Sequence, residues 1–172
     1  MRTACWLLSW LVLGAATATA TAAEPDKLAN PAIDSARFLR VAHEAVAWRE
    51  SRRIGEDEFI AMARDRSTVV LDARSREMFS AFRVKGAVNL PFPDIAVSTL
   101  ARLLPDKDVR ILIYCNNNFE GAPETMASKL PSASLNLSTF AALYNYGYRN
   151  VYELGPRLDV RTTRIPFVGK AR

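Results

Sequence analysis

The sequence has very few side chains that suit metal binding or disulfide formation. It contains 1 histidine and 2 cysteines in 172 residues, and Cys5 lies in the apolar N-terminal stretch. His43 and Cys115, which are left, do not make a zinc or copper ligand set. If the N-terminal stretch is removed, Cys115 has no cysteine to pair with. We therefore expect no metal, no cofactor and no intramolecular disulfide.

The chain also lacks a strong charge bias. Its net charge of +5 comes from 23 basic and 18 acidic residues, and the arginines are scattered along the chain. No stripe of basic residues alternates with aromatic residues, so a nucleic acid is not an expected partner. The hydrophobic share of 49% and the charged share of 24% are typical of a globular domain with an ordinary core.

A long apolar run is found only at the N-terminus. Arg2 precedes an apolar stretch over residues 4–16, a small-residue tract follows to Ala23, and polar sequence begins at Glu24. This is the layout of a secretory signal peptide, and the apolar stretch is short for a membrane span. We expect cleavage before Ala23 or Glu24, and a periplasmic or secreted protein without stable membrane association. An uncleaved N-terminal anchor is the alternative.

The hydrophobic pattern predicts helices that alternate with strands. Helices are expected over 35–51, 56–64, 95–104 and 138–146, and strands over 53–54, 68–72, 86–91, 110–114 and 150–154. Asp34 and Ser138 are the expected N-caps, and Gly147 is the expected stop of the last helix. This alternation predicts a parallel sheet that is covered on both faces, with a ligand site beyond the carboxyl ends of the strands. Cys115 directly follows the most apolar strand, so the topology and the thiol select the same position.

Four segments resemble the rhodanese family, and they occur in the family's order. These are Val-Val-Leu-Asp-Ala-Arg at 69–74, the Gly-Ala-Val-Asn-Leu-Pro region within 83–91, Ile-Leu-Ile-Tyr-Cys at 111–115, and the Gly-Tyr-Arg-Asn-Val segment within 147–155. The resemblance implies a three-layer α/β/α rhodanese-like fold with a mainly parallel sheet of about five strands. We accordingly expect a signal peptide over 1–23, an N-terminal helical extension over 24–52, the rhodanese-like domain over 53–160 and a C-terminal tail over 161–172.

The loop after the cysteine departs from the family pattern. Family members usually have a short loop there that often ends in arginine and runs directly into a helix. In this chain Glu120 and Gly121 stand where arginine is expected, and the next helix is expected only at Ser138. Residues 116–137 are therefore interpreted as an insertion that covers Cys115 and is more mobile than the sheet. Pro123 is expected to open a short helix over 123–129.

The resemblance implies that Cys115 is the catalytic nucleophile, which attacks a sulfane sulfur as a thiolate. The residues expected to bind the substrate are Asn116, Asn117, Asn118, Phe119, Glu120, Gly121 and Arg74. The asparagines suit a loop around the sulfur, because asparagine tolerates left-handed conformations and supplies amide donors; the alternative is an ordinary polar turn. Arg74 either supplies positive charge or pairs with Asp72 or another carboxylate, and the structural pair is the favoured interpretation.

The resulting functional prediction is an exported sulfurtransferase or persulfide carrier, with thiosulfate or a persulfide as donor. Its expected partners are a small sulfur-containing substrate or a partner protein thiol. The alternative is a catalytically weak or inactive rhodanese-type module that binds proteins and in which Cys115 is buried and inert. Phosphatase or arsenate-reductase chemistry is disfavoured, because Gly121 replaces the arginine that would hold a dianion.

Overall fold

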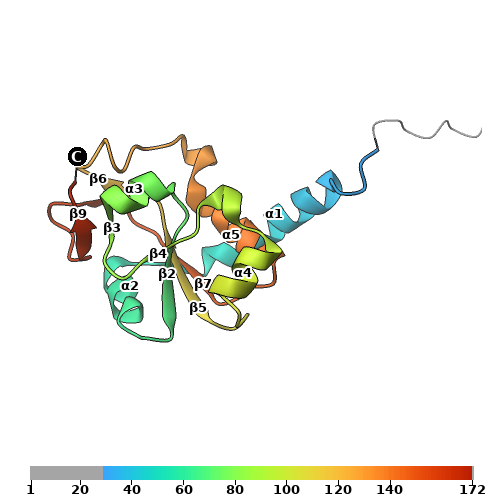
Figure 1. The fold of residues 1–172 in the computed structure, drawn as a ribbon, viewed down its shortest axis with the longest axis horizontal. Coiled ribbons are helices and arrows are strands. Elements are labelled where there is room, and N and C mark those ends of the chain that lie inside the picture. The colour runs from blue at the N-terminus through green and yellow to red at the C-terminus, as the bar shows by residue number, and fades with distance from the viewer. Residues whose placement is uncertain (1–28, 172) are drawn as a thin grey trace, which may run out of the picture. The chain divides into compact units, whose positions relative to one another are not determined.

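Five parallel strands form the centre of the fold, which a computed structural model describes for residues 29–171 (Figure 1). The strand order is β1-β7-β5-β2-β4, and each neighbouring pair is parallel. Strand β5, Arg110–Tyr114, has a partner on each side. The predicted parallel sheet and the inner position of this strand are therefore confirmed. The predicted signal peptide and Cys5 lie outside the described residues.

The remaining strands of the central sheet are β1 (Arg53–Ile54), β2 (Thr68–Asp72), β4 (Val88–Asn89) and β7 (Val151–Leu154). The α-helices are α1 (Ser35–Glu50), α2 (Glu56–Ala63), α3 (Arg76–Ala81), α4 (Val97–Leu103) and α5 (Leu135–Asn145). Two further pairs consist of β3 (Phe82–Val84) antiparallel to β9 (Phe167–Gly169), and β6 (Phe119–Glu120) parallel to β8 (Leu158–Asp159). Single 3-10 turns cover Phe92–Asp94, Asn116–Asn118 and Pro131–Ala133.

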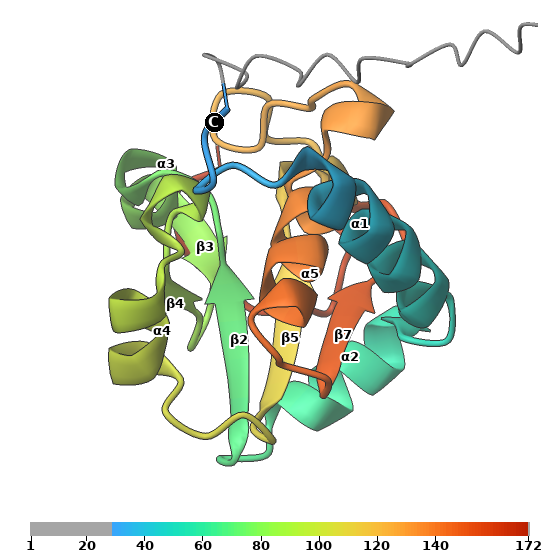
Figure 2. The same cartoon turned by 90° about the vertical axis from the view of Figure 1, so that its right-hand side faces the viewer.

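The two faces of β5 contribute to two separate apolar cores. Ile111 and Ile113 pack with residues of α1, α4 and α5, and Figure 2 shows α1 and α5 on the near side of the sheet. Leu112 and Tyr114 pack on the other face with α2, β3 and the C-terminal segment. Successive strand residues point to opposite faces, so a strand that is buried on both faces is a continuous apolar run. The layered α/β/α architecture predicted from the sequence is thus confirmed.

Helix α1 follows the predicted bounds closely. The Asp34 carboxylate accepts a hydrogen bond from the backbone N–H of Arg37 at 2.8 Å, as expected of an N-cap. Near its other end, Arg49 forms an ion pair with Glu153 of β7, and Glu153 is buried. His43 is exposed. The ion pair connects helix α1 to the central sheet, so α1 packs on the domain.

Two helix predictions in the segment after Cys115 are wrong. Helix α5 begins at Leu135, one turn before the predicted start, and Ser134 rather than Ser138 is its N-cap. The extra turn is held by Asn136, whose side chain donates to Asn118 at 2.9 Å. The C-terminal end agrees with the prediction, because Gly147 has a φ of +92° directly after the helix.

No helix forms over residues 123–129. A helix there needs the N–H of Lys129 to bond to the carbonyl of Thr125. Instead, the Lys129 N–H donates to Asn117 Oδ1 at 2.8 Å, and the Thr125 carbonyl accepts from Arg74 at 2.9 Å. The backbone groups that a helix would need thus form hydrogen bonds with side chains from other parts of the chain.

Two strands, β8 and β9, follow the strand that the sequence predicted to be the last. The ring of Phe167 in β9 stacks on Phe82 at 4.6 Å and meets Phe119 edge-on at 5.1 Å. Ile165, at 3% exposure, also belongs to the core. The described part of the predicted tail therefore packs against the domain. Among residues 29–171, no helix has both the length and the apolar character needed to cross a bilayer.

Candidate active site around Cys115

Cys115 lies at the carboxyl end of the central strand, where open parallel sheets place their ligand sites. It is the only cysteine among the described residues, and its exposed fraction is 1%. Its backbone is extended, and its N–H donates to Asn118 Oδ1 at 2.9 Å. The thiol is therefore fixed in position and covered.

The asparagines after Cys115 form a 3-10 turn, and none of them adopts the left-handed conformation that asparagine tolerates. Among residues 29–171, every residue with positive φ is a glycine. The Asn116 amide donates to the carbonyl of Ala127. Asn117 donates to the carbonyl of Lys129 at 3.0 Å and accepts from its N–H at 2.8 Å. These two side chains fasten residues 121–134, which we call the cover segment, next to the cysteine turn.

Asn118 joins three structural elements at the site and is 5% exposed. Its Nδ2 donates to the carbonyls of Leu154 at 2.6 Å and Pro156 at 3.2 Å, just after β7. Its Oδ1 accepts from the N–H of Cys115 and from Asn136 of α5. Its side-chain amide is thus used to position the cysteine turn, although the sequence suggested that it would bind substrate.

The N-terminus of α5 lies at the sulfur, although the insertion separates the two along the chain. The hydroxyl of Ser134 is 3.5 Å from Cys115 Sγ and 19 residues away in sequence. Ser134 is the N-cap residue, but its side chain makes no capping hydrogen bond. A helix N-terminus carries partial positive charge that favours a nearby anion. The Ser134 hydroxyl is therefore available to donate to the sulfur. Ser134 suits an N-cap by residue type, but Ser138 suits one equally well, and the sequence pattern favoured Ser138.

Arg74 is buried below the cover segment and is fully occupied by protein acceptors. Its guanidinium binds both oxygens of Asp72, with the shortest contact at 2.6 Å, and donates to the carbonyls of Thr125 and Phe82. Burial lowers the pKa of Arg74, but the hydrogen bond and charge of Asp72 outweigh burial, so that the pKa is raised overall. The predicted pairing with Asp72 is present, and Arg74 acts as a positioning residue.

Tyr114 extends this buried network towards β3. Its hydroxyl donates to Asp72 Oδ2 at 2.5 Å and accepts from the N–H of Val84 at 3.1 Å. Burial is the main reason that the pKa of Tyr114 is raised, and the negative charge of Asp72 adds to it. The hydroxyl therefore stays protonated, and it holds Asp72 in place for Arg74. The sequence did not reveal this role, because Tyr114 reads simply as part of an apolar strand.

A positive charge acts on the sulfur from α1. The pKa of Arg49 is raised, chiefly by its hydrogen bond to Glu153 and against the effect of burial, and a negative charge on Cys115 contributes to the rise. Arg49 is therefore close enough to the sulfur for their charges to interact, while Glu153 holds its guanidinium.

The last three predicted loop residues have other contacts. Phe119 is fully buried and packs edge-on against Tyr114 at 5.9 Å. Glu120 is exposed and pairs with Arg157 at 3.3 Å. Gly121 has a φ of +86°, and a Cβ there would lie 2.7 Å from Asp159 Oδ1. The structure thus groups Cys115 with the three asparagines and Ser134, whereas residues 119–121 build the β6–β8 pair.

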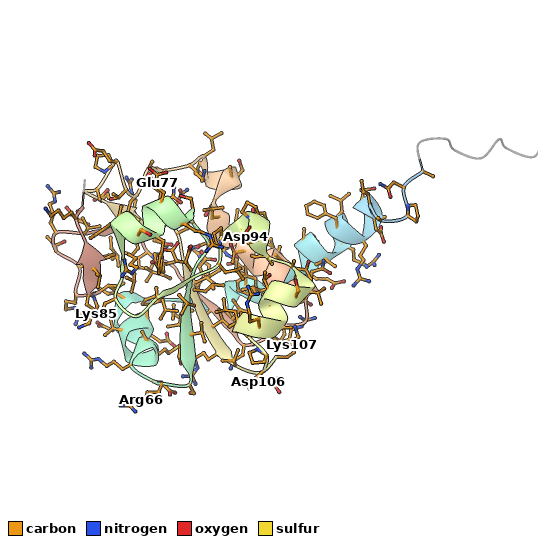
Figure 3. All side chains as sticks on the ribbon, in the orientation of Figure 1. Arg66, Glu77, Lys85, Asp94, Asp106 and Lys107 are labelled. Atoms are coloured by element: carbon orange, nitrogen blue, oxygen red, sulfur yellow. The ribbon has the colours of Figure 1, made fainter. Side chains whose placement is uncertain are left out.

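Two surface hollows lie elsewhere on the domain. The larger, about 460 Å³, is at the amino ends of β2 and β5, and Figure 3 labels two of its residues, Arg66 and Asp106. The smaller, about 190 Å³, lies between α1 and α5. Neither is lined by Cys115. Among the described residues, no group of three or more histidine, cysteine, aspartate or glutamate side chains is arranged to hold a metal ion.

Comparison with known proteins finds a family match that includes the cysteine. The model of the rhodanese-like domain matches residues 56–154. Among curated proteins, none matches the chain significantly. An Escherichia coli rhodanese with anions is 23% identical, with a TM-score of 0.41, and the match covers 60% of this chain and 99% of that one.

A protein from Bacillus halodurans is 21% identical, with a TM-score of 0.46 and coverage of 69% and 77% of the two chains. A thiosulfate sulfurtransferase from Pseudomonas aeruginosa is 21% identical, with a TM-score of 0.44 and coverage of 67% and 20%. The family match spans more than half of the sequence and contains four of the five strands of the parallel sheet, the buried Asp72–Arg74 pair and Cys115. The chain therefore belongs to the rhodanese-like domain family.

Proposed function

We propose that the protein is an exported sulfurtransferase or persulfide carrier in which Cys115 accepts a sulfane sulfur. The observation that carries the proposal is the position of the thiol. It lies at the end of the central strand of a rhodanese-like domain, with the N-terminus of α5 and the Ser134 hydroxyl at its sulfur. A hydroxyl donor and a helix N-terminus beside the sulfur suit a cysteine that acts as a nucleophile.

The proposed reaction has two steps and needs no added oxidant. The Cys115 thiolate attacks the outer sulfur of a donor persulfide, the donor S–S bond breaks, and the donor leaves as a thiolate. Cys115 then carries a persulfide. A thiolate or cyanide acceptor attacks its terminal sulfur, the new S–S bond breaks, and the Cys115 thiolate is restored.

The charges around the sulfur favour a persulfide donor over thiosulfate. Thiosulfate is a dianion, and binding it calls for a cationic side chain. Arg74 is occupied by Asp72 and two backbone carbonyls, and Arg49 is occupied by Glu153. A persulfide of a small thiol or of a partner protein carries less charge, so it relies less on such a group.

Turnover assays test this preference directly. We expect glutathione persulfide to react about tenfold faster than thiosulfate with cyanide as acceptor, which corresponds to one charge-assisted contact of ~1.4 kcal/mol that thiosulfate lacks. Cys115→Ser should remove both activities. Faster turnover with thiosulfate would show that backbone donors alone are enough to bind the dianion.

The burial of Cys115 supports a second candidate function, a protein-binding module without catalytic activity. At 1% exposure, Cys115 reaches a substrate only after a local movement of the structure around it. Alkylation by iodoacetamide under native conditions separates the two functions. Reaction within minutes supports the enzyme, and reaction only in denaturant supports the module.

The export part of the proposal rests on the signal-peptide pattern over residues 1–23. N-terminal sequencing of protein recovered from the cell envelope should begin at Ala23 or Glu24. Protein that retains Met1 in the cytoplasmic fraction would exclude export.

A further inference from the structure

The hollow between α1 and α5 brings together three arginine side chains. Arg37 and Arg40 belong to α1, Arg149 follows α5, and the hollow has a volume of about 190 Å³. Glu44 is the one acidic residue in its lining. Figure 2 shows the two helices side by side over this part of the molecule. The lining therefore carries an excess of positive charge, and a pocket of this size holds a carboxylate group rather than a whole peptide.

The positive charge of the hollow is not balanced by ion pairs within residues 29–171. Arg37, Arg40 and Arg149 form no ion pair with a described residue. Other exposed arginines, such as Arg53, Arg64 and Arg102, are also unpaired among the described residues. What distinguishes the hollow is that three unpaired arginines line one pocket, where an external anion can contact more than one of them.

Arg149 is already held in position for such a contact. Its guanidinium stacks on the ring of Tyr144 at 3.7 Å, and its Nη1 donates to the Tyr144 carbonyl at 2.6 Å. Its Nε and Nη2 donate to no acceptor among the described residues. A guanidinium that is fixed in this way loses little freedom when it binds a carboxylate.

An exposed aromatic side chain lies beside the hollow on α1. Phe38 is 66% exposed and is three residues before Val41, which lines the hollow, so the two lie next to each other on the helix surface. Exposed aromatic side chains near arginine are typical of protein interfaces. We propose that this surface binds an acidic segment of a partner protein, with carboxylates in the hollow and a neighbouring apolar side chain on Phe38.

The geometry of α5 relates this surface to the candidate active site. The helix begins beside Cys115 and ends at the hollow, and its 11 residues span about 16 Å at 1.5 Å per residue. About five extended residues bridge that distance. A partner that docks at the hollow is thus close enough to present a thiol to Cys115. The docking itself does not depend on sulfur transfer, and it is tested by binding alone.

Fluorescence anisotropy of a short labelled peptide of alternating glutamate and leucine tests the proposal with the purified protein. We expect saturable binding that weakens as salt is added, because the contacts are between exposed charges. The same peptide with glutamine in place of glutamate should bind at least about fivefold more weakly. Equal binding of both peptides would overturn the proposal.

Variants locate the site. Arg37→Gln/Arg40→Gln and Arg149→Gln should each weaken peptide binding at least about fivefold. Arg149→Lys should have an intermediate effect, because it keeps the charge and loses the stacked, planar group. Arg76→Gln and Arg157→Gln, at exposed arginines outside the hollow, are the matched controls and should bind normally. Unchanged binding by the hollow variants would overturn the proposal, and circular dichroism checks that each variant is folded.

Three further results would also overturn it. Competition by inorganic phosphate at equal concentration would reveal a site for small anions only. Binding to vesicles of phosphatidylglycerol without binding of the peptide would identify the surface as a membrane contact. Tighter peptide binding by Glu24→Gln/Asp26→Asn would show that the chain's own acidic N-terminal residues occupy the hollow.

Discussion

At the scale of single residues, Arg74 is the side chain on which the support of the site most depends. It and Asp72 are both buried, and Arg74 also binds backbone carbonyls of β3 and of the cover segment. Removing one member of a buried pair leaves the other charge without compensation. We therefore expect Arg74→Gln to lower the free energy of unfolding by ~3 kcal/mol, measured by urea denaturation.

Arg76→Gln is the matched control for this substitution. Arg76 is 79% exposed and pairs with Asp94 at the surface, where ion pairs contribute ~0.5 kcal/mol. Equal loss of stability in the two variants would show that the buried pair has no special role.

Ser134 gives a second prediction at this scale, because its hydroxyl contacts the sulfur. Ser134→Ala should slow the alkylation of Cys115 about fivefold at neutral pH, which corresponds to the loss of one hydrogen bond of ~1 kcal/mol to the thiolate. At high pH, where the thiol is ionised in both proteins, the rates should converge. Ser138→Ala, one turn later in α5, is the control. A reduction that is the same at every pH would indicate a structural effect only.

The sequence was sufficient to single out Cys115 and the Asp72–Arg74 pair, but not the rest of the site. Cys115 follows a strand that is apolar on both faces, and Asp72 and Arg74 are two residues apart, so local pattern reveals both. Ser134 and Asn136 reach the cysteine turn from 18 or 19 residues away. Contacts of that kind depend on tertiary packing, which a sequence pattern does not contain.

At the scale of elements, we expect the cover segment to control how a substrate reaches the sulfur. Asn117 fastens it through two hydrogen bonds to the backbone of Lys129. Asn117→Ala should therefore make local opening easier and raise the native alkylation rate of Cys115 about tenfold, at ~1 kcal/mol or less for each bond. Ser128→Ala, an exposed position in the same segment, should leave the rate unchanged. An unchanged rate in Asn117→Ala would mean that access does not depend on this segment. The predicted high mobility of the segment relative to the sheet is a separate prediction that hydrogen exchange measures.

Long elements could be predicted from the sequence, whereas short elements that depend on distant partners could not. Helix α1 and strands β2 and β5 agree with the predicted bounds within a residue or two, because their periodicity or apolar run extends over several residues. Strands β8 and β9 have two or three residues each and exist through pairing with β6 and β3. Helix α3 is only six residues long and buries none of them, so it has no apolar stripe to detect.

At the scale of the whole molecule, the buried Arg49–Glu153 pair makes α1 an integral part of the domain. Glu153 is 4% exposed, so Arg49→Met should lower the free energy of unfolding by ~3 kcal/mol. The double variant Arg49→Met/Glu153→Leu should regain most of this loss, because no charge is then buried alone. Urea denaturation of both variants measures the effect. A single variant that is as stable as the unaltered protein would show that α1 is attached by other contacts.

The central claim is that Cys115 accepts sulfur within this fold. Mass spectrometry of the protein after incubation with glutathione persulfide tests it most directly. The account predicts that the peptide with Cys115 gains the mass of one sulfur atom, that dithiothreitol removes it, and that Cys115→Ser shows no gain. A Cys115 that stays unmodified in the folded protein, while the denatured protein takes up sulfur from the same donor, would contradict it.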